Sequence, residues 1–309
     1  MFSVFFNVGQ QVAVLFILIF VGFLLTKLSV IKEGGAKVMT DIVLYAVTPC
    51  VIINAFQREF DPSMLKGLLI ALLCAFCVML FSVLLAELLY RRQQIEKAVV
   101  YKFAVLFSNC GFMALPLQEA VLGSDGVFYG AAYIAVFNIF MWTYGLITMS
   151  GKKETKEIVK AVVNPGIIGT VIGVLFFVLQ VSLPTIVKEP ISFLASLNTP
   201  VPMLIIGFYL ATSNMTKALK DVHAYISIFI RLVGIPLLAL FVMYFVGIDS
   251  VVLCAVVIAA SSPVAAFSTM MSAKYNRDTQ LSAGIVCAST LFSLLTIPLV
   301  VGLAQYLTR

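Results

Sequence analysis

The stretch FSNCGFMALPL, residues 107–117, places polar and helix-weakening residues in the middle of a long apolar segment. The residues concerned are Ser108, Asn109, Cys110, Gly111 and Pro116. Irregular backbone at membrane depth is tolerated only where protein, water or a ligand satisfies its polar groups. The first N–H groups of a helix that restarts after a break favour anions. The stretch therefore predicts a binding site for a small anion at a helix break.

A second stretch of the same kind is AASSPVAAFST, residues 259–269, with Ser261, Ser262 and Pro263 at its centre. Two matched helix breaks in one chain point to a site where the broken helices cross. The alternative is that the prolines only kink packed helices while the serines bond back to helix carbonyls. We expect the crossing, with Ser108, Asn109, Ser261 and Ser262 binding a carboxylate.

Other polar residues lie at membrane depth without an assigned partner. For the three amides, contact with a ligand and bonding between helices are both open. Thr–Pro pairs at two further positions predict helix breaks and cavity walls. Arg231, about ten residues into an apolar segment, has either a functional role or an ion pair or a snorkelling position, and His223 lies near a segment end. The amides and Thr–Pro residues are Asn54, Asn138, Asn198, Thr48, Pro49, Thr199 and Pro200.

The inventory of reactive side chains argues against an enzyme. One His in the chain excludes histidine-cluster metal sites, and neither a G-x-S-x-G nor a Walker motif is present. The six Cys lie in apolar runs and resemble small buried hydrophobes. No metal and no cofactor is therefore expected.

The elements that must position these residues are apolar helices. The chain has 309 residues, of which 62% are hydrophobic and 11% charged, a composition typical of a membrane protein. Continuous apolar runs predict an all-α integral membrane protein with ten spans. They lie near residues 8–28, 36–57, 64–90, 97–122, 126–149, 164–182, 190–213, 221–246, 250–273 and 279–306.

The chain also repeats itself at an offset of 151 residues. TPCVIINAF begins at Thr48 and TPVPMLIIGF at Thr199, and the same offset relates SMLKGL (63–68) to NMTKAL (214–219). Residues 1–150 and 164–309 are each predicted to hold five spans, joined by a basic cytoplasmic linker at 151–163. An odd number of spans inverts the second unit relative to the first, which is typical of secondary transporters.

The distribution of basic residues predicts the orientation. Fifteen Lys and Arg fall in the odd-numbered loops, against four in the even-numbered loops and the C-terminus. The odd loops are therefore expected in the cytoplasm and both termini outside it. This bias accounts for the net charge of +6 without a nucleic-acid partner.

In motif order and spacing the sequence resembles a prokaryotic member of the auxin efflux carrier family. The motifs are FSNCGFMALPL, VNPGIIGTVIG (163–173), TPVPMLIIGFYLA (199–211) and ASSPVAAF (260–267). The resemblance implies an inverted repeat of five plus five spans, related to the bile-acid and sodium–proton antiporter folds, with an elevator-like transport domain. It also implies that Asn109, Gly111 and Pro116 form the crossover of the fourth span and Pro263 that of the ninth.

Together these features predict a secondary carrier of small organic anions in the cell membrane, with malate- or malonate-like carboxylates as substrates. Export of an aromatic acid resembling indole acetate is an alternative, and sodium-coupled symport of the bile-acid type is another. Paired acidic residues are absent from the predicted crossover, which argues against sodium. The expected partners are the carboxylate and the lipid bilayer; a homodimer is an open question.

Overall fold

The computed structural model describes residues 2–92, 95–151, 165–213 and 216–308. The predicted linker 151–163 lies outside these residues except for Gly151. In the described part of the chain, regular structure consists of helices and one isolated β-bridge. The α-helices and π-helical turns (η) run in the order α1 Phe2–Lys27, α2 Glu33–Ile42, η1 Val43–Val47, α3 Thr48–Phe56, α4 Pro62–Tyr90, α5 Ile95–Leu106, η2 Cys110–Ala114, α6 Leu115–Leu122, α7 Ser124–Phe140, η3 Met141–Gly145, α8 Leu146–Ser150, α10 Pro165–Val178, α11 Thr185–Ser196, α12 Pro200–Thr212, α13 Thr216–Leu219, α14 Val222–Phe229, η4 Ile230–Gly234, α15 Ile235–Val246, α16 Ser250–Ser261, α17 Phe267–Lys274 and α18 Thr279–Leu307.

The predicted apolar segments are helical, as their composition requires. Within the described residues, seven helices are long and apolar enough to cross a membrane: Phe5–Lys27, Glu33–Phe56, Pro62–Tyr90, Ser124–Ser150, Thr185–Thr212, Val222–Val246 and Thr279–Leu307. Three shorter apolar helices are Cys110–Leu122, Pro165–Val178 and Ser250–Ser261. Helices satisfy every backbone hydrogen bond within the segment, which is what the hydrocarbon core of a bilayer demands. An all-helical membrane-spanning chain is confirmed.

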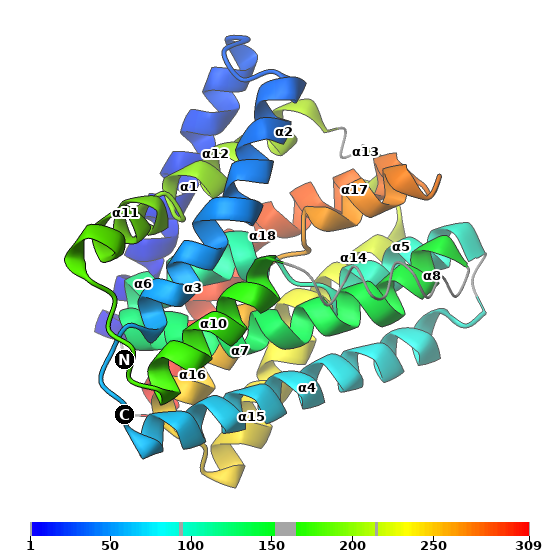
Figure 1. Cartoon of the computed structure of the whole chain (residues 1–309). Coiled ribbons are helices and arrows are strands. Elements are labelled where there is room, and N and C mark those ends of the chain that lie inside the picture. The colour runs from blue at the N-terminus through cyan, green and yellow to red at the C-terminus, as the bar shows by residue number, and fades with distance from the viewer. Residues whose placement is uncertain (1, 93–94, 152–164, 214–215, 309) are drawn as a thin grey trace.

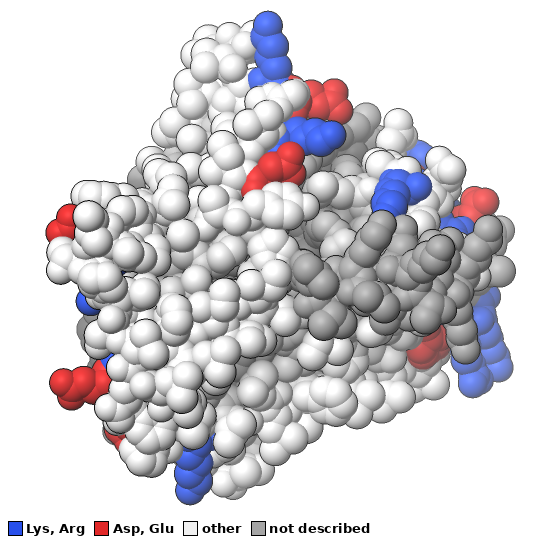
Figure 2. Space-filling model, in the orientation of Figure 1, with Lys and Arg blue, Asp and Glu red and all other residues white. Residues whose placement is uncertain are grey.

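The outer surface of the helices suits lipid rather than water. Along α4, Leu69, Leu73, Leu84 and Leu88 are all exposed. In Figure 2 the Lys, Arg, Asp and Glu side chains drawn on this face lie towards its edges, and the described residues between them are uncharged. An uncharged band between charged ends is the pattern that a bilayer imposes on a spanning protein.

The helices form two bundles that meet side by side (Figure 1). The smaller bundle contains α1, α2–η1–α3, α10 and α11–α12, in which α1 packs on α12 and α10 packs on α3. The larger bundle contains the remaining helices, with α4 packed on α7 and α16 packed on α7, α15 and α18. The bundles touch along α1 and α18 and along α3, α10 and α7. Each bundle therefore draws helices from both of the predicted halves of the chain.

Glycines bring the helices of the smaller bundle into backbone contact. A Cβ added at Gly207 of α12 would lie 2.2 Å from the Ile19 carbonyl oxygen of α1, and one at Gly22 would lie 2.5 Å from the Leu204 oxygen. A Cβ at Gly169 of α10 would lie 3.0 Å from the Cα of Pro49. Small residues at such contacts allow the close packing that holds helices together in lipid.

We expect Gly207→Ala to lower the melting temperature of the purified protein. The added methyl group has no space against the α1 backbone, and overpacking of this kind costs about 1–3 kcal/mol. Gly9→Ala is the matched control, since Gly9 lies on α1 with nothing within 4 Å of its added Cβ. Differential scanning fluorimetry in detergent measures both variants. Equal melting temperatures would show that the α1–α12 contact is looser than described.

Prolines follow the π-helical turns in a regular way. Three of the four π turns in the described residues are followed by proline two positions after their end: η1 by Pro49, η2 by Pro116 and η4 by Pro236. Proline cannot donate to the carbonyl four residues earlier and crowds it, and a wider turn relieves that contact. Pro116 and Gly111 therefore lie inside the helical segment Cys110–Leu122. The prediction that these two residues interrupt the helix was wrong.

Candidate functional site

The two broken helices cross each other at the centre of the larger bundle. One break lies between α5 and η2, at residues 107–109, and the other between α16 and α17, at residues 262–266. Ser108 and Val264 form an antiparallel bridge. The Asn109 N–H donates to the Pro263 carbonyl at 2.6 Å, and the Ala265 N–H donates to the Phe107 carbonyl at 2.8 Å. Backbone groups freed by each break are thus satisfied by the other break.

Side chains from neighbouring helices hold the crossing in place. The Val264 N–H donates to the hydroxyl of Ser289, a buried residue of α18, at 3.1 Å. Gln118 of α6 donates its side-chain amide to the Ala255 carbonyl of α16 at 2.8 Å. The sequence analysis missed both residues, because a single serine or glutamine in an apolar helix carries no local sign of its partner.

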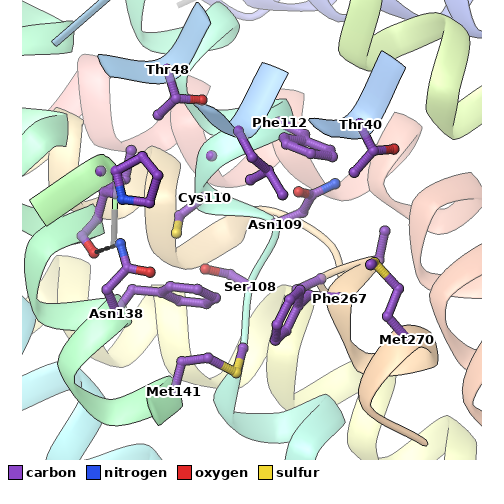
Figure 3. A pocket seen from close by; sticks show the side chains of 18 of the residues that line it. Thr40, Thr48, Ser108, Asn109, Cys110, Phe112, Asn138, Met141, Phe267 and Met270 are labelled. Carbon is purple, nitrogen blue, oxygen red and sulfur yellow. Dashed lines mark hydrogen bonds between the residues drawn. The ribbon is translucent and has the colours of Figure 1, made fainter. Parts of the chain in front are cut away.

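A cavity of about 270 Å³ lies between the two bundles and reaches the crossing (Figure 3). Helices η1, α2, α3, α10 and α12 of the smaller bundle and η2, α7, η3 and α17 of the larger bundle contribute to it. Its lining comprises Thr40, Asp41, Leu44, Tyr45, Thr48, Ser108, Asn109, Cys110, Gly111, Phe112, Ile134, Phe137, Asn138, Met141, Trp142, Pro165, Gly166, Tyr209, Ala265, Ala266, Phe267 and Met270. Ligand sites in proteins are concave and mostly apolar, with a few convergent polar groups, and this cavity has that character.

Six of the predicted site residues line the cavity: Thr48, Ser108, Asn109, Cys110, Gly111 and Asn138. Asn109 is 6% exposed and caps the start of the segment Cys110–Leu122, and its side-chain amide bonds to no other described residue. The buried Ser108 hydroxyl also lacks a hydrogen-bond partner in the part of the chain described. Asn138 donates to the Ile134 carbonyl of its own helix at 3.0 Å. Asn109 is therefore the amide most available to a ligand.

The structure corrects the prediction for Ser261 and Ser262, which do not line the cavity. Both are fully buried at the end of α16, and their hydroxyls donate to the Ile258 carbonyl at 3.1 and 3.0 Å. This is the back-bonding that the alternative interpretation of the serines expected. A serine whose hydroxyl bonds to its own helix has no donor left for a carboxylate.

The remaining predicted wall and break residues also lie outside the cavity lining. Asn198 is buried in the loop between α11 and α12, and neither polar atom of its side chain has a partner among the described residues. Thr48–Pro49 follows the π turn η1 inside the continuous helix Glu33–Phe56, whereas Thr199–Pro200 begins α12. Proline is accommodated at a helix start because the N–H it lacks would have no helical acceptor there. The residues outside the lining are Pro49, Asn54, Pro116, Asn198, Thr199, Pro200, Ser261, Ser262 and Pro263.

The cavity contains residues that the sequence analysis did not select. Asp41 is an exposed carboxylate on α2 in its lining. Six aromatic side chains form much of the remaining wall: Tyr45, Phe112, Phe137, Trp142, Tyr209 and Phe267. The rings of Trp142 and Phe267 meet edge to face, with centroids 5.8 Å apart. An acidic residue within an apolar span was a usable signal for Asp41. The aromatic residues gave none, because the chain contains 25 Phe and 11 Tyr.

Arg231, the deepest predicted ionisable residue, is completely buried in η4 outside the cavity lining. It does not snorkel to the membrane surface. Among the described residues it pairs with no carboxylate. Its guanidinium donates instead to the carbonyls of Val105 and Leu106, both at 3.0 Å, and of Ala260 at 2.5 Å. These carbonyls lie in the last turns of α5 and α16, immediately before the two breaks.

His223 lies at the start of α14, away from the cavity. Its ring stacks on Tyr101 with centroids 5.6 Å apart, and its Nδ1 lies 3.9 Å from an Asp221 oxygen. The Tyr101 hydroxyl donates to the other Asp221 oxygen at 2.6 Å. This cluster ties α5 to α14 near the segment ends, so His223 has a structural setting rather than a place in the cavity.

The arrangement at the crossing can hold an anion. The segment Cys110–Leu122 starts at the cavity, and the first N–H groups of a helix have no intrahelical acceptor. They carry the positive end of the helix dipole, equivalent to about half an elementary charge. The free amide of Asn109 adds a neutral donor beside them. Such a site can bind a ligand, but it has no group that would make or break covalent bonds.

Comparison with known proteins agrees with a binding and transport role. Two archaeal proteins are each 24% identical to this chain and are named as uncharacterised transporters. The protein of Methanothermobacter thermautotrophicus aligns over 96% of this chain and 98% of its own length. That of Methanocaldococcus jannaschii aligns over 93% and 96%. A sequence model of the family described as membrane transport protein matches residues 7–160 and 153–301. This chain therefore belongs to the membrane transport protein family, that of the auxin efflux carriers, and is a multi-pass membrane transporter rather than an enzyme.

Proposed function

We propose that the protein is a secondary carrier of small organic anions, with the carboxylate bound at the crossing of the two broken helices. The observation that supports this best is the cavity between the bundles, which reaches the free amide of Asn109 and the N-terminal turn of Cys110–Leu122. Because a helix N-terminus attracts negative charge, this end of the cavity favours a carboxylate over a cation.

The architecture that we propose for transport is the inverted repeat of five plus five spans. Seven long apolar helices, the short helix α10 and the two broken helices together supply ten segments. The breaks at 107–109 and 262–266 face each other, and each predicted half holds a Thr–Pro pair in a helical segment, Thr48–Pro49 and Thr199–Pro200. A cavity shared by two bundles suits an elevator-like movement of the larger bundle past the smaller one, which would carry the crossing from one side to the other.

Two classes of substrate fit this cavity. Small carboxylates such as malate or malonate would use the polar residues at the crossing. An aromatic monocarboxylate is favoured by a separate observation, the six aromatic side chains of the cavity lining. Aromatic rings attract one another edge to face as well as stacked, as Trp142 and Phe267 do at 5.8 Å, so these rings could pack against an aromatic substrate.

Uptake of a panel of radiolabelled acids into proteoliposomes tests the proposal. The panel contains malate, malonate, acetate, indole acetate and neutral indole ethanol. Saturable uptake of at least one acid, without uptake of the neutral analogue, is the expected result. Trp142→Ala separates the substrate classes, since it should reduce uptake of an aromatic acid and leave uptake of malate unchanged. A protein that moves none of the acids, or moves the neutral analogue equally well, is not an organic anion carrier.

We propose further that the cavity opens towards the cytoplasm and that both termini lie outside. The cavity residues Thr40, Trp142 and Pro165 lie in the parts of their segments that adjoin the basic odd-numbered loops. Those loops are expected in the cytoplasm. A reporter fused after Arg309 that is active only outside the cytoplasm should therefore be active. Activity of a cytoplasm-dependent reporter at the same position would reverse the orientation.

A further inference from the structure

The four helix ends at the crossing carry charges that cancel one another. The segment Cys110–Leu122 and helix α17 start there, while α5 and α16 end there. Each start is equivalent to about half a positive charge and each end to about half a negative charge. Where half-helix ends of this kind meet in transporters, the carbonyls at the C-terminal ends coordinate a cation. The carbonyls concerned here would be those of the last turns of α5 and α16.

Arg231 already donates hydrogen bonds to those carbonyls. Its Nη1 donates to Val105 and Leu106 at the end of α5, and its Nη2 donates to Ala260 at the end of α16. A single side chain thus binds both C-terminal ends at once. The guanidinium is always protonated in proteins, so a full positive charge lies at the centre of the larger bundle. No carboxylate of the described residues forms an ion pair with it.

The position of this charge matters for the cavity. Arg231 does not line the cavity, but it donates to the carbonyl of Leu106, two residues before Ser108, which does. With the helix ends cancelling, the crossing as a whole carries one positive charge from Arg231. One carboxylate beside Asn109 would neutralise it, whereas the carboxylate of Asp41 in the same lining lies exposed on α2. Charges in a poorly hydrated interior are costly unless paired, so an anion at the crossing and a cation behind it stabilise each other.

We propose that Arg231 is a built-in counter-cation, which takes the place of a mobile coupling cation at the C-terminal ends of both half-helices and lets the carrier bind one carboxylate without a co-bound cation. This inference rests on the proposed function for its substrate. Its cation part can be tested without any substrate.

The first test measures the melting temperature of Arg231→Ala in detergent. Solutions contain sodium, potassium, choline or methylguanidinium as the chloride, the last at concentrations far below those that denature proteins. We expect the variant to melt below the wild type and to recover part of the loss in methylguanidinium or sodium, but none in choline. The wild type should melt at the same temperature in sodium, potassium and choline. A variant that responds to none of the cations would overturn the proposal.

Lys102→Ala is the matched control for loss of a partly buried cation. Lys102 lies on α5 and pairs with Glu87 of α4 at 2.6 Å, and it binds none of the carbonyls that Arg231 binds. Its variant should show no gain from methylguanidinium beyond that of the wild type. Equal gains in both variants would mean a general effect of the cation, and the proposal would fail.

Arg231→Lys keeps the test decisive if the alanine variant does not fold. Lysine retains the charge but offers fewer donors in a fixed geometry. Its melting temperature is expected to be independent of sodium, as in the wild type. A lysine variant that gains stability from sodium would show that the charge alone does not replace a cation.

Transport completes the design and separates the two proposals. Arg231→Ala in proteoliposomes should lose uptake of the transported acid and regain it partly with methylguanidinium or sodium. Uptake by this variant at the wild-type rate in choline would overturn the role of Arg231. If the wild type moves no organic anion while the melting experiments show the expected cation response, the proposed function fails and the counter-cation remains.

Discussion

Asn109→Ala is expected to weaken binding of the transported acid about 10- to 150-fold, with a corresponding loss of transport, while leaving the protein folded in the membrane. The contacts of Asn109 with the rest of the crossing run through its backbone: its N–H donates to Pro263, and its carbonyl accepts from Met113 and Ala114. Alanine keeps all three bonds. What it removes is a side-chain amide that bonds to no other described residue and lies in the cavity lining.

The size of the effect follows from the chemistry of the bond. A hydrogen bond to a charged group contributes about 1.5–3 kcal/mol, which corresponds to roughly 10- to 150-fold in affinity. The other side-chain amide of the cavity lining, that of Asn138, already donates to the carbonyl of Ile134. Isothermal titration measures the affinity for the transported acid, uptake in proteoliposomes measures transport, and the melting temperature measures stability.

Asn198→Ala is the matched control, because it removes a buried amide outside the cavity. Both polar atoms of Asn198 lack partners among the described residues, so their loss should leave the melting temperature unchanged or raise it. If Asn109 serves only to bond helices together, its variant should instead lose about 0.6–2 kcal/mol of stability and still bind the acid. That result would remove Asn109 from the site.

The second large effect expected is on the driving force: uptake should respond to membrane potential and ignore a sodium gradient. A carboxylate held by helix N-termini and Arg231 crosses without a co-bound cation, so its net movement carries negative charge. A potential of 100 mV is worth about 2.3 kcal/mol per charge, or roughly fiftyfold in the accumulation ratio. The potential of a cell, negative inside, would favour exit of the anion.

Liposomes with a potassium–valinomycin potential measure this directly. Flux should follow the imposed potential and remain the same when sodium replaces choline. Asp41 is the one carboxylate in the cavity lining of the described residues, and it precedes Thr48 by seven residues, about 10 Å along a helix. Asp41→Asn therefore tests whether this group carries a proton. We expect the variant to keep the dependence of flux on membrane potential. A change in the dependence of flux on pH would show that Asp41 takes up a proton. Flux that requires sodium and ignores the potential would contradict an anion bound without a cation.

The sequence alone determined the helical segments and the positions of the two breaks. Apolar runs of this length must be helical in lipid, because only a helix satisfies its own backbone there. The break next to Asn109 and the break at Pro263 were also visible, because polar residues, glycine and proline act on the backbone at their own positions. The motifs around these residues were sufficient to indicate the family as well.

Only the tertiary structure decided which side chains face the cavity. Successive residues of a helix point about 100° apart, so Ser261 and Ser262 could be assigned to a site only if the facing side of their helix were known. In water, the polar face of a helix reveals its exposed side. In this chain, apolar side chains are favoured at the lipid-facing surface, at helix contacts and in the cavity wall alike. The pattern of apolar residues therefore does not show which side of a helix faces the cavity. For that reason the aromatic wall around Trp142 and the carbonyl partners of Arg231 emerged only from the packed bundles.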